Sequence, residues 1–254
     1  MNATAGVIYC AAGEKYIQEA IRSAHTLKQK SPGISVSLFT DQSAAYIEPF
    51  DHILPLPEPR YSLIDRFYAL RHTPYEKSLC LDCDTLVLQP IDSLFEILNR
   101  VPITATHAPL RHQHFPHLQH PDVPDSFPLL NVGVLGFARS EAMDRLLEDW
   151  YRRYCAHLAI DPTSCDQPSF RESLWFSELS YHVLPPEYNF RLPYWALKGM
   201  NCKVVIAHSH NFSKMTPQQL RDFAEIMDDD AALFWNPFKE QVIRGRRGYA
   251  QRWR

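Results

Sequence analysis

The sequence predicts an α/β fold in which helices cover both faces of a mostly parallel, Rossmann-like sheet. Short apolar runs alternate with segments whose apolar residues recur at helical spacing, as in strand–helix–strand units. Runs such as residues 5–12 are apolar almost throughout, which is typical of strands buried on both faces. With 254 residues, of which 45% are hydrophobic, we expect a single domain over residues 1–254.

The N-terminal half alternates most regularly. The expected strands are residues 5–12, 34–40, 51–56, 76–82 and 85–88, and the expected helices are residues 14–30, 62–72 and 90–99. In the first helix, Ile17, Ala20 and Leu27 lie at helical spacing. The turn sequence Ser-Pro-Gly then separates this helix from the second strand.

The C-terminal half is less regular. The expected strands are residues 102–108, 129–138, 181–185, 189–195 and 202–211, and the expected helices are residues 140–158 and 165–176. Ser140 is the expected N-cap of the longer helix. Residues 108–128 form an irregular segment rich in proline and histidine, and two polar helices and a basic tail (239–254) are expected after residue 211.

Composition narrows the class of protein. A formal net charge of -3 gives no overall attraction to nucleic acid. We expect neither a membrane span nor a signal peptide, because no apolar segment is long enough and the N-terminus has no basic leader. Irregularly spaced cysteines in apolar runs indicate reduced thiols and a cytoplasmic location. The basic tail is either solvated or in peripheral contact with an anionic surface such as the inner membrane.

Two aspartates interrupt a run that a core would fill with apolar residues. Asp82 and Asp84 lie in "LCLDCDTLVL", where a strand ends, and ligands of parallel sheets bind at such ends. If the chain stays extended, both carboxylates point the same way and repel each other unless a cation lies between them. Mg²⁺ and Mn²⁺ suit such oxygen ligands. Alternatively, one aspartate caps a turn and the other is solvated.

A histidine can supply a third ligand. The apolar run 202–211 ends at His208 and His210, where either could join the aspartates from a neighbouring strand. An Asp/Asp/His set favours Mn²⁺ somewhat over Mg²⁺, because imidazole is softer than carboxylate. Taken alone, each histidine is better explained as an ordinary strand-end residue, and whether His210 assists His208 is open.

Four ordered pieces of the chain resemble a known family. They are residues 66–88, "LNVGVLGF" (130–137), "DQPSF" (166–170) and "HSHNFSK" (208–214). Together they resemble the retaining GT-A glycosyltransferases of the glycogenin and bacterial lipopolysaccharide galactosyl- and glucosyltransferase type. The resemblance implies a GT-A fold and metal-dependent transfer of a hexose, with UDP-glucose or UDP-galactose the expected donor, to a hydroxyl of a glycan or glycolipid with retention.

The resemblance also assigns residues to roles. Asp82, Asp84 and His208 would hold Mn²⁺ or Mg²⁺ against the diphosphate. The implied donor-binding residues are Ala11 and Tyr16 around uracil, Asp82 near the ribose, Asn211 beside the diphosphate, and Arg66 and Lys214 as basic contacts. Those implied at the reaction centre are Asn131, Asp166 and Gln167, and residues 108–128 would form an acceptor-side loop. Simpler explanations stay open for the three residues implied at the reaction centre. Asn131 could satisfy backbone groups at a strand edge, Asp166 could be a helix N-cap, and Gln167 could be a surface residue.

Three positions depart from the family pattern. Gly13 stands where related enzymes often carry an aspartate that reads the uracil edge. Asn211 replaces a glycine, and asparagine tolerates a left-handed conformation better than most residues. The sequence Lys-Met-Thr-Pro at 214–217 lacks the Pro-Trp expected after the late lysine. The base preference is therefore the least secure part of the resemblance.

Two other functions are compatible with the sequence. "LDCDTLV" also looks like the motif of haloacid dehalogenase-type phosphatases, in which Asp82 would be the nucleophile. That motif normally lies on the first strand and carries a glycine, so this interpretation ranks lower. The second alternative is a nucleotide-sugar-binding protein without turnover, which Gly13 and the missing Pro-Trp leave open.

Overall fold

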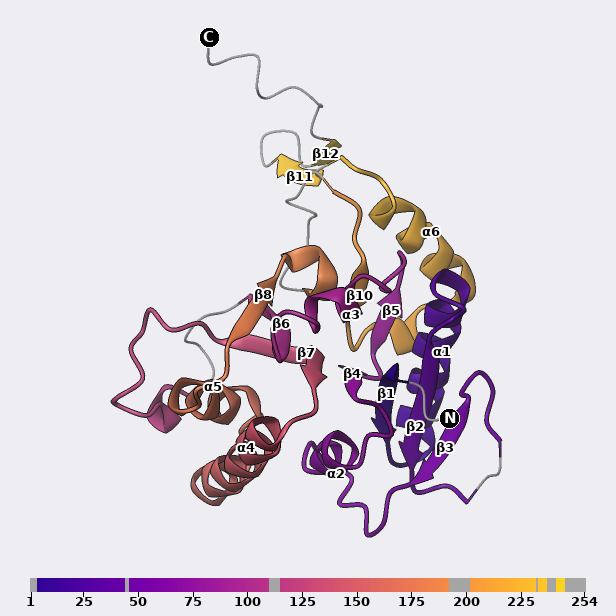
Figure 1. Cartoon of the computed structure of the whole chain (residues 1–254). Helices are drawn as coiled ribbons and strands as arrows, with labels where there is room; N and C mark the ends of the chain where they lie inside the picture. Colours follow the sequence, from indigo (N-terminus) through magenta and orange to yellow (C-terminus); the bar gives the residue numbers. More distant parts are fainter. Residues whose placement is uncertain are drawn as a thin grey trace.

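The chain forms a seven-stranded sheet with strand order β3-β2-β1-β4-β7-β6-β8 (Figure 1). This computed structural model describes residues 4–43, 46–109, 115–191, 202–231, 233–236 and 241–244. The strands of the main sheet are β1 (Ala5–Ala11), β2 (Ser35–Thr40), β3 (His52–Pro55), β4 (Lys77–Leu81), β6 (Ile103–His107), β7 (Leu130–Ala138) and β8 (Tyr181–Leu184).

The expected mostly parallel sheet is confirmed. Within this sheet β7 runs antiparallel to both of its neighbours, β4 and β6, and the other pairs are parallel. Because β7 is reversed, its first residues lie at the edge where the parallel strands end. Asp82, just after β4, donates its backbone N–H to the carbonyl of Gly133 on β7 at 2.8 Å. The reversed strand therefore contributes to the same edge of the sheet as the paired aspartates.

Helices cover both faces of the sheet, as predicted. The helices are α1 (Glu14–Lys30), α2 (Asp65–Arg71), α3 (Leu94–Ile97), α4 (Glu141–Ile160), α5 (Gln167–Phe176) and α6 (Pro217–Met227). Figure 1 shows α1 on one side of the main sheet and α4 and α5 on the other. Strand β1 serves both faces, because Val7 and Tyr9 pack with α1 whereas Ile8 packs with α2 and α4. Ser140 caps α4 as expected, accepting the N–H of Met143 at 3.1 Å.

A second, three-stranded sheet lies at the end of β4. It consists of β5 (Thr85–Val87), β10 (Ile206–His208) and β9 (Phe190–Arg191), in the order β5-β10-β9. The 3₁₀ turns η2 (Pro186–Asn189) and η3 (Phe212–Lys214) flank it along the chain. Its apolar residues pack against α6, so this small sheet has a core of its own. It brings the end of the apolar run at 202–211 next to the paired aspartates.

Two expectations for the last part of the chain need correction. The predicted strand at 202–211 is only three residues long, since β10 spans Ile206–His208. Of the two polar helices expected after residue 211, the described residues contain α6, followed by a two-stranded antiparallel sheet of β11 (Leu233–Asn236) and β12 (Gln241–Arg244). The aromatic and β-branched residues of these strands favour extended structure over helix. Apart from β12, the basic tail lies outside the described residues.

The segment predicted as an acceptor-side loop is held against α5 in the part that is described. Residues 110–114 lie outside that part, and η1 (Pro116–Leu118) follows. Arg171 of α5 donates to the backbone carbonyls of Phe127 at 3.1 Å and Pro124 at 2.6 Å. No helix in the described ranges is long and apolar enough to span a bilayer.

Candidate active site

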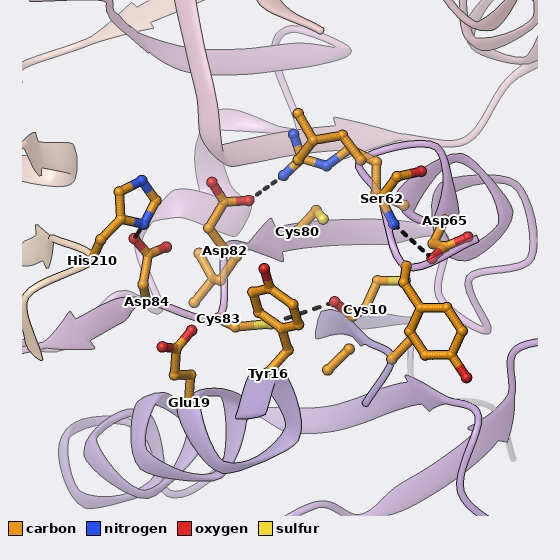
Figure 2. Close-up of a pocket in the computed structure, with 16 residues that line it drawn as sticks. Cys10, Tyr16, Glu19, Ser62, Asp65, Cys80, Asp82, Cys83, Asp84 and His210 are labelled. Carbon is orange, nitrogen blue, oxygen red and sulfur yellow. Dashed lines mark hydrogen bonds and ion pairs between the residues drawn. The ribbon is translucent and has the colours of Figure 1, made fainter. Parts of the chain in front are cut away.

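The paired aspartates lie in the turn between β4 and β5, not on an extended strand. Cys83 and Asp84 are in a turn conformation, and Thr85 donates its hydroxyl hydrogen to the backbone carbonyl of Asp82 at 2.8 Å. The condition of an extended chain, under which both carboxylates would point the same way, is therefore not met. The turn nevertheless brings the two carboxylates near each other at the edge of a pocket, as Figure 2 shows.

His208 joins the two aspartates from β10. Antiparallel pairing of β10 with β5 sets His208 opposite Thr85, the residue that follows Asp84. Its Nε2 atom lies 3.0 Å from Oδ1 of Asp84 and 3.5 Å from Oδ2 of Asp82. One ligand atom from each of the three residues can be chosen so that all lie within 4.8 Å of one another. The structure thus brings together the three residues that the sequence predicts as metal ligands.

Two asparagines fix the protonation of the His208 ring. The side-chain oxygen of Asn131 accepts the backbone N–H of Gly133 at 2.9 Å and an amide N–H of Asn189 at 3.0 Å. The remaining oxygen of Asn189 can only accept, and it lies 2.9 Å from Nδ1 of His208. Nδ1 therefore carries the hydrogen, and in the neutral ring Nε2 has a free lone pair.

This free nitrogen shows that the residues fit a divalent metal ion. His208 is 3% exposed, and its Nε2 atom is buried without a hydrogen-bond partner among the described residues. A buried lone pair facing two carboxylates is unfavourable unless a proton or a metal cation lies between them, and three such donors suit the metal cation. Two carboxylates and an imidazole, the latter held by a second hydrogen-bonded residue, form a usual donor set for such an ion.

Gly133 makes room for this cluster. A Cβ atom at this position would lie 2.4 Å from Cε1 of His208 and 2.7 Å from Oδ2 of Asp82. Both distances are far below van der Waals contact, so no larger residue fits unless the ligands move. Close packing against His208 and Asp82 thus explains why the first glycine of the "LNVGVLGF" segment is a glycine.

Arg66 connects the aspartate turn to the start of α5. Its guanidinium forms ion pairs with Asp82 and, at 2.7 Å, with Asp166, and both Arg66 and Asp166 are buried. Burial raises the pKa of Asp166, an effect that the charge of Arg66 opposes. Asp166 occupies the N-cap position of α5, but its side chain makes no capping hydrogen bond. Gln167, the first residue of α5, is half-buried beside it.

A pocket of about 300 Å³ opens beside the cluster. Of the predicted donor residues, Ala11, Tyr16, Arg66 and Asp82 line it. The buried thiol of Cys80, which also lines the pocket, stays neutral because burial raises its pKa to about 12. The residues drawn in Figure 2 come from β1 and the residue after it, from α1, from α2 and the segment before it, and from β4 and the β4–β5 turn, together with His210.

Other predicted residues lie away from this lining. Asn131 is buried in the asparagine pair described above. Asn211, just before η3, and Lys214, the last residue of η3, are both exposed. Asn211 has φ -83°, so the left-handed conformation considered for it does not occur.

Several residues of the site carry no clear sequence signal. Asn189 and Glu19 were not predicted, and Arg191 lies in a segment expected only to be a strand. His210 was a candidate, and its Nδ1 atom lies 2.7 Å from Oδ2 of Asp84. This hydrogen bond raises the pKa of His210, and Nε2 of the same ring accepts a hydrogen bond from Arg191 at 2.9 Å. The position of His208 and His210 at the end of an apolar run is the sequence feature that indicates both histidines.

Comparison with known proteins establishes the class of fold. No family model and no curated protein matches the chain. Among solved structures, mouse xyloside xylosyltransferase 1 in its apo form is similar with a TM-score of 0.59, 14% identity, and coverage of 83% of this chain and 99% of that one. An active-site mutant of LgtC, in which glutamate replaces a glutamine, has a TM-score of 0.56 and 15% identity over 81% and 87% of the two chains.

The galactosyltransferase LgtC in complex with donor and acceptor sugar analogs has a TM-score of 0.54 and 13% identity over 87% and 96% of the two chains. At these identities the likeness concerns the fold. The chain has the GT-A, Rossmann-like α/β fold of these transferases, which confirms the expected fold class.

Proposed function

We propose that the protein is a metal-dependent glycosyltransferase that moves a hexose from a nucleotide-diphosphate sugar to a hydroxyl of a glycan or glycolipid. UDP-glucose or UDP-galactose is the proposed donor, and the anomeric configuration is retained. The observation that carries the proposal is the Asp82–Asp84–His208 cluster, with its unpartnered buried Nε2 atom, beside a pocket at the strand ends of a GT-A fold.

The three clustered side chains would hold Mn²⁺ or Mg²⁺. When bound, such an ion supplies charge that stabilises a diphosphate leaving group. Arg66 orients Asp82 through their ion pair, and its own charge lies close to the pocket. Lys214 is exposed on η3, from where it is proposed to contact the diphosphate.

The sugar is proposed to lie near Asp166 and Gln167. Loss of the diphosphate leaves an oxocarbenium-like sugar, which carboxylate and amide oxygens stabilise. Asp166 is held in place by Arg66, and its neighbour Gln167 is half-buried. Asn131 enters the proposal mainly as the residue that orients Asn189 and, through it, His208.

The acceptor side and the cellular location complete the proposal. Residues 108–128 are proposed to contact the acceptor. A cytoplasmic location is supported by the six free cysteines. Peripheral contact of the tail with the inner surface of a membrane stays a prediction, since that tail lies largely outside the described residues.

Thermal unfolding with and without ligands tests the proposal. UDP or a UDP-sugar with Mn²⁺ should raise the melting temperature, because a ligand that binds the native state stabilises it. Asp84→Ala should abolish this shift, whereas Asp222→Ala, which removes an exposed carboxylate on α6, should leave it intact. A UDP-sugar that stabilises the protein is then tested as the donor in a transfer assay, and NMR determines the anomeric configuration of the product.

The alternatives predict different results. Metal-dependent nucleotide binding without donor hydrolysis or transfer would indicate a binding protein without turnover. If no nucleotide stabilises the protein and a generic phosphoester is hydrolysed in a manner that depends on Asp82, the phosphatase alternative replaces the proposal.

A further inference from the structure

Glu19 is a buried acidic residue that faces the pocket from α1. It is 7% exposed and lines the pocket together with Tyr16, which precedes it by one helical turn. In Figure 2 the Glu19 carboxylate points from α1 toward the region of Asp84. Within the described part of the chain, no residue donates a hydrogen bond to this carboxylate or forms an ion pair with it.

The other acidic residues of the lining all have partners. Asp65 accepts the backbone N–H groups of Arg60 at 2.8 Å and Ser62 at 3.3 Å. Asp82 pairs with Arg66, and Asp84 pairs with His210. Glu19 differs from these residues because no described residue donates to its carboxylate, which leaves its oxygens free to accept hydrogen bonds from a ligand in the pocket.

The chemistry of the pocket limits what this partner can be. A carboxylate accepts hydrogen bonds and repels phosphate, so Glu19 cannot face the diphosphate itself. Glu19 also does not belong to the Asp82–Asp84–His208 cluster, whose ligand atoms lie within 4.8 Å of one another. The lining includes apolar and aromatic residues, among them Ala11, Tyr16 and Tyr61, as well as the carboxylates of Asp82 and Asp84.

A nucleoside diphosphate whose base packs against Tyr16 and whose diphosphate lies beside Asp82 and Asp84 would place its ribose between them, next to the part of the lining that α1 contributes. We propose that Glu19 binds the nucleotide by accepting a hydrogen bond from a ribose hydroxyl, and that it thereby selects ribonucleotides over deoxyribonucleotides. This inference rests on the proposed function, because it takes a nucleoside diphosphate as the ligand. Glu19 contributes to donor binding and takes no part in bond breaking.

Calorimetric titration of wild type and variants with UDP, 2′-deoxy-UDP and 3′-deoxy-UDP in the presence of Mn²⁺ tests the inference. A hydrogen bond to a charged group predicts that wild type binds UDP roughly tenfold or more tightly than at least one deoxy analogue. Glu19→Ala should weaken UDP binding by a similar factor and reduce the difference in affinity between UDP and the deoxy analogue. Glu19→Gln, which keeps an acceptor and the side-chain shape, should fall between the two. Glu225→Gln, an exposed substitution on α6, should match wild type.

The outcomes separate this inference from the function on which it rests. If wild type binds UDP but Glu19→Ala weakens the ribo and deoxy forms equally, Glu19 does not contact the ribose and the inference is overturned. A loss of Mn²⁺ affinity in Glu19→Gln without nucleotide would also overturn it, because Glu19 would then act on the metal. If wild type binds none of UDP, GDP, ADP and CDP, the proposed function fails and the inference fails with it.

Discussion

At the scale of single residues, the orientation of His208 depends on two uncharged side chains. A series of hydrogen bonds runs from the backbone N–H of Gly133 through Asn131 and Asn189 to His208. Because this N–H can only donate, the side-chain amides of Asn131 and Asn189 each have one possible orientation. A hydrogen-bond partner of this kind fixes the tautomer and the orientation of a metal-binding histidine ring. The metal site is therefore larger than its three ligands.

Replacing Asn189 with leucine should weaken metal binding. The variant removes the acceptor for the Nδ1 hydrogen of His208, so the ring can rotate or adopt the other tautomer. We expect Mn²⁺ affinity to fall roughly 10- to 100-fold, measured by the electron paramagnetic resonance signal of free Mn²⁺. Leucine at the exposed position Gln218 provides the control. Unchanged affinity in Asn189→Leu would mean that the asparagine pair does not orient the ligand.

Gly133 and Gly33 form a matched pair of glycines. In Gly133→Ala the new methyl group collides with His208 and Asp82. In Gly33→Ala the new methyl group would have no described residue within 4 Å apart from its two neighbours in the chain. We expect Gly133→Ala to lose about 1–3 kcal/mol of stability and most of its metal affinity, and Gly33→Ala to retain both. Chemical denaturation and Mn²⁺ titration of the two variants check this, and equal metal affinity would contradict the steric explanation.

At the scale of elements, the α4–α5 pair is joined by a carboxylate on α4. Asp149 accepts hydrogen bonds from Arg153 at 2.6 Å, from Arg152, and from Ser173 of α5 at 2.9 Å. Burial would raise the pKa of Asp149, but these hydrogen bonds, with the charge of Arg153, outweigh it and hold that pKa below its usual value. The two helices frame the position of Asp166, so this junction supports the site from outside.

The lowered pKa of Asp149 predicts a dependence of stability on pH. A carboxylate whose pKa is lower in the folded state stabilises that state above its unfolded pKa, at roughly pH 4, and this contribution is lost as the pH falls further. Asp149→Asn should therefore melt below wild type at neutral pH, with a difference that shrinks toward pH 3. Calorimetry across this range measures the effect. A constant difference would show that Asp149 acts by shape and not by charge.

At the scale of the whole molecule, Arg66 ties together parts of the chain that are far apart in sequence. It extends from α2 to Asp82 after β4 and to Asp166 at the start of α5. Burial alone would lower the pKa of Arg66, but the two carboxylates raise it, so the guanidinium stays charged inside the protein.

Removing this charge should leave Asp166 without its partner. Arg66→Met is expected to cost about 3–5 kcal/mol in the free energy of unfolding, as for a broken buried ion pair. Adding Asp166→Asn removes the stranded charge and should recover part of that loss. Denaturant unfolding of the two single variants and the double variant forms the cycle that measures this coupling. Additive losses would indicate that the two residues do not interact.

Local patterns in the sequence predict most of the elements and draw attention to the paired aspartates, whereas the choice of His208 as the third ligand comes from the family resemblance. Apolar periodicity marks strands and helices wherever they are long, and Asp82 and Asp84 interrupt such a run visibly. Short elements such as β10 have too few residues to show a period, and β11 lies in the part of the chain where the sequence predicts polar helices. Asn189 and Glu19 are not predicted by such patterns either, because their importance depends on which residues the folded chain brings beside them.

The pairing of β5 with β10 has a consequence for how the protein is made. Asp84 emerges from the ribosome well before His208, so a nascent chain carries two of the three clustered ligands while the third is still untranslated. An ion held by all three residues could bind only after residue 208 has been translated. A chain truncated before β10 would lack the histidine ligand, and its affinity for a metal ion should be lower than that of the whole chain.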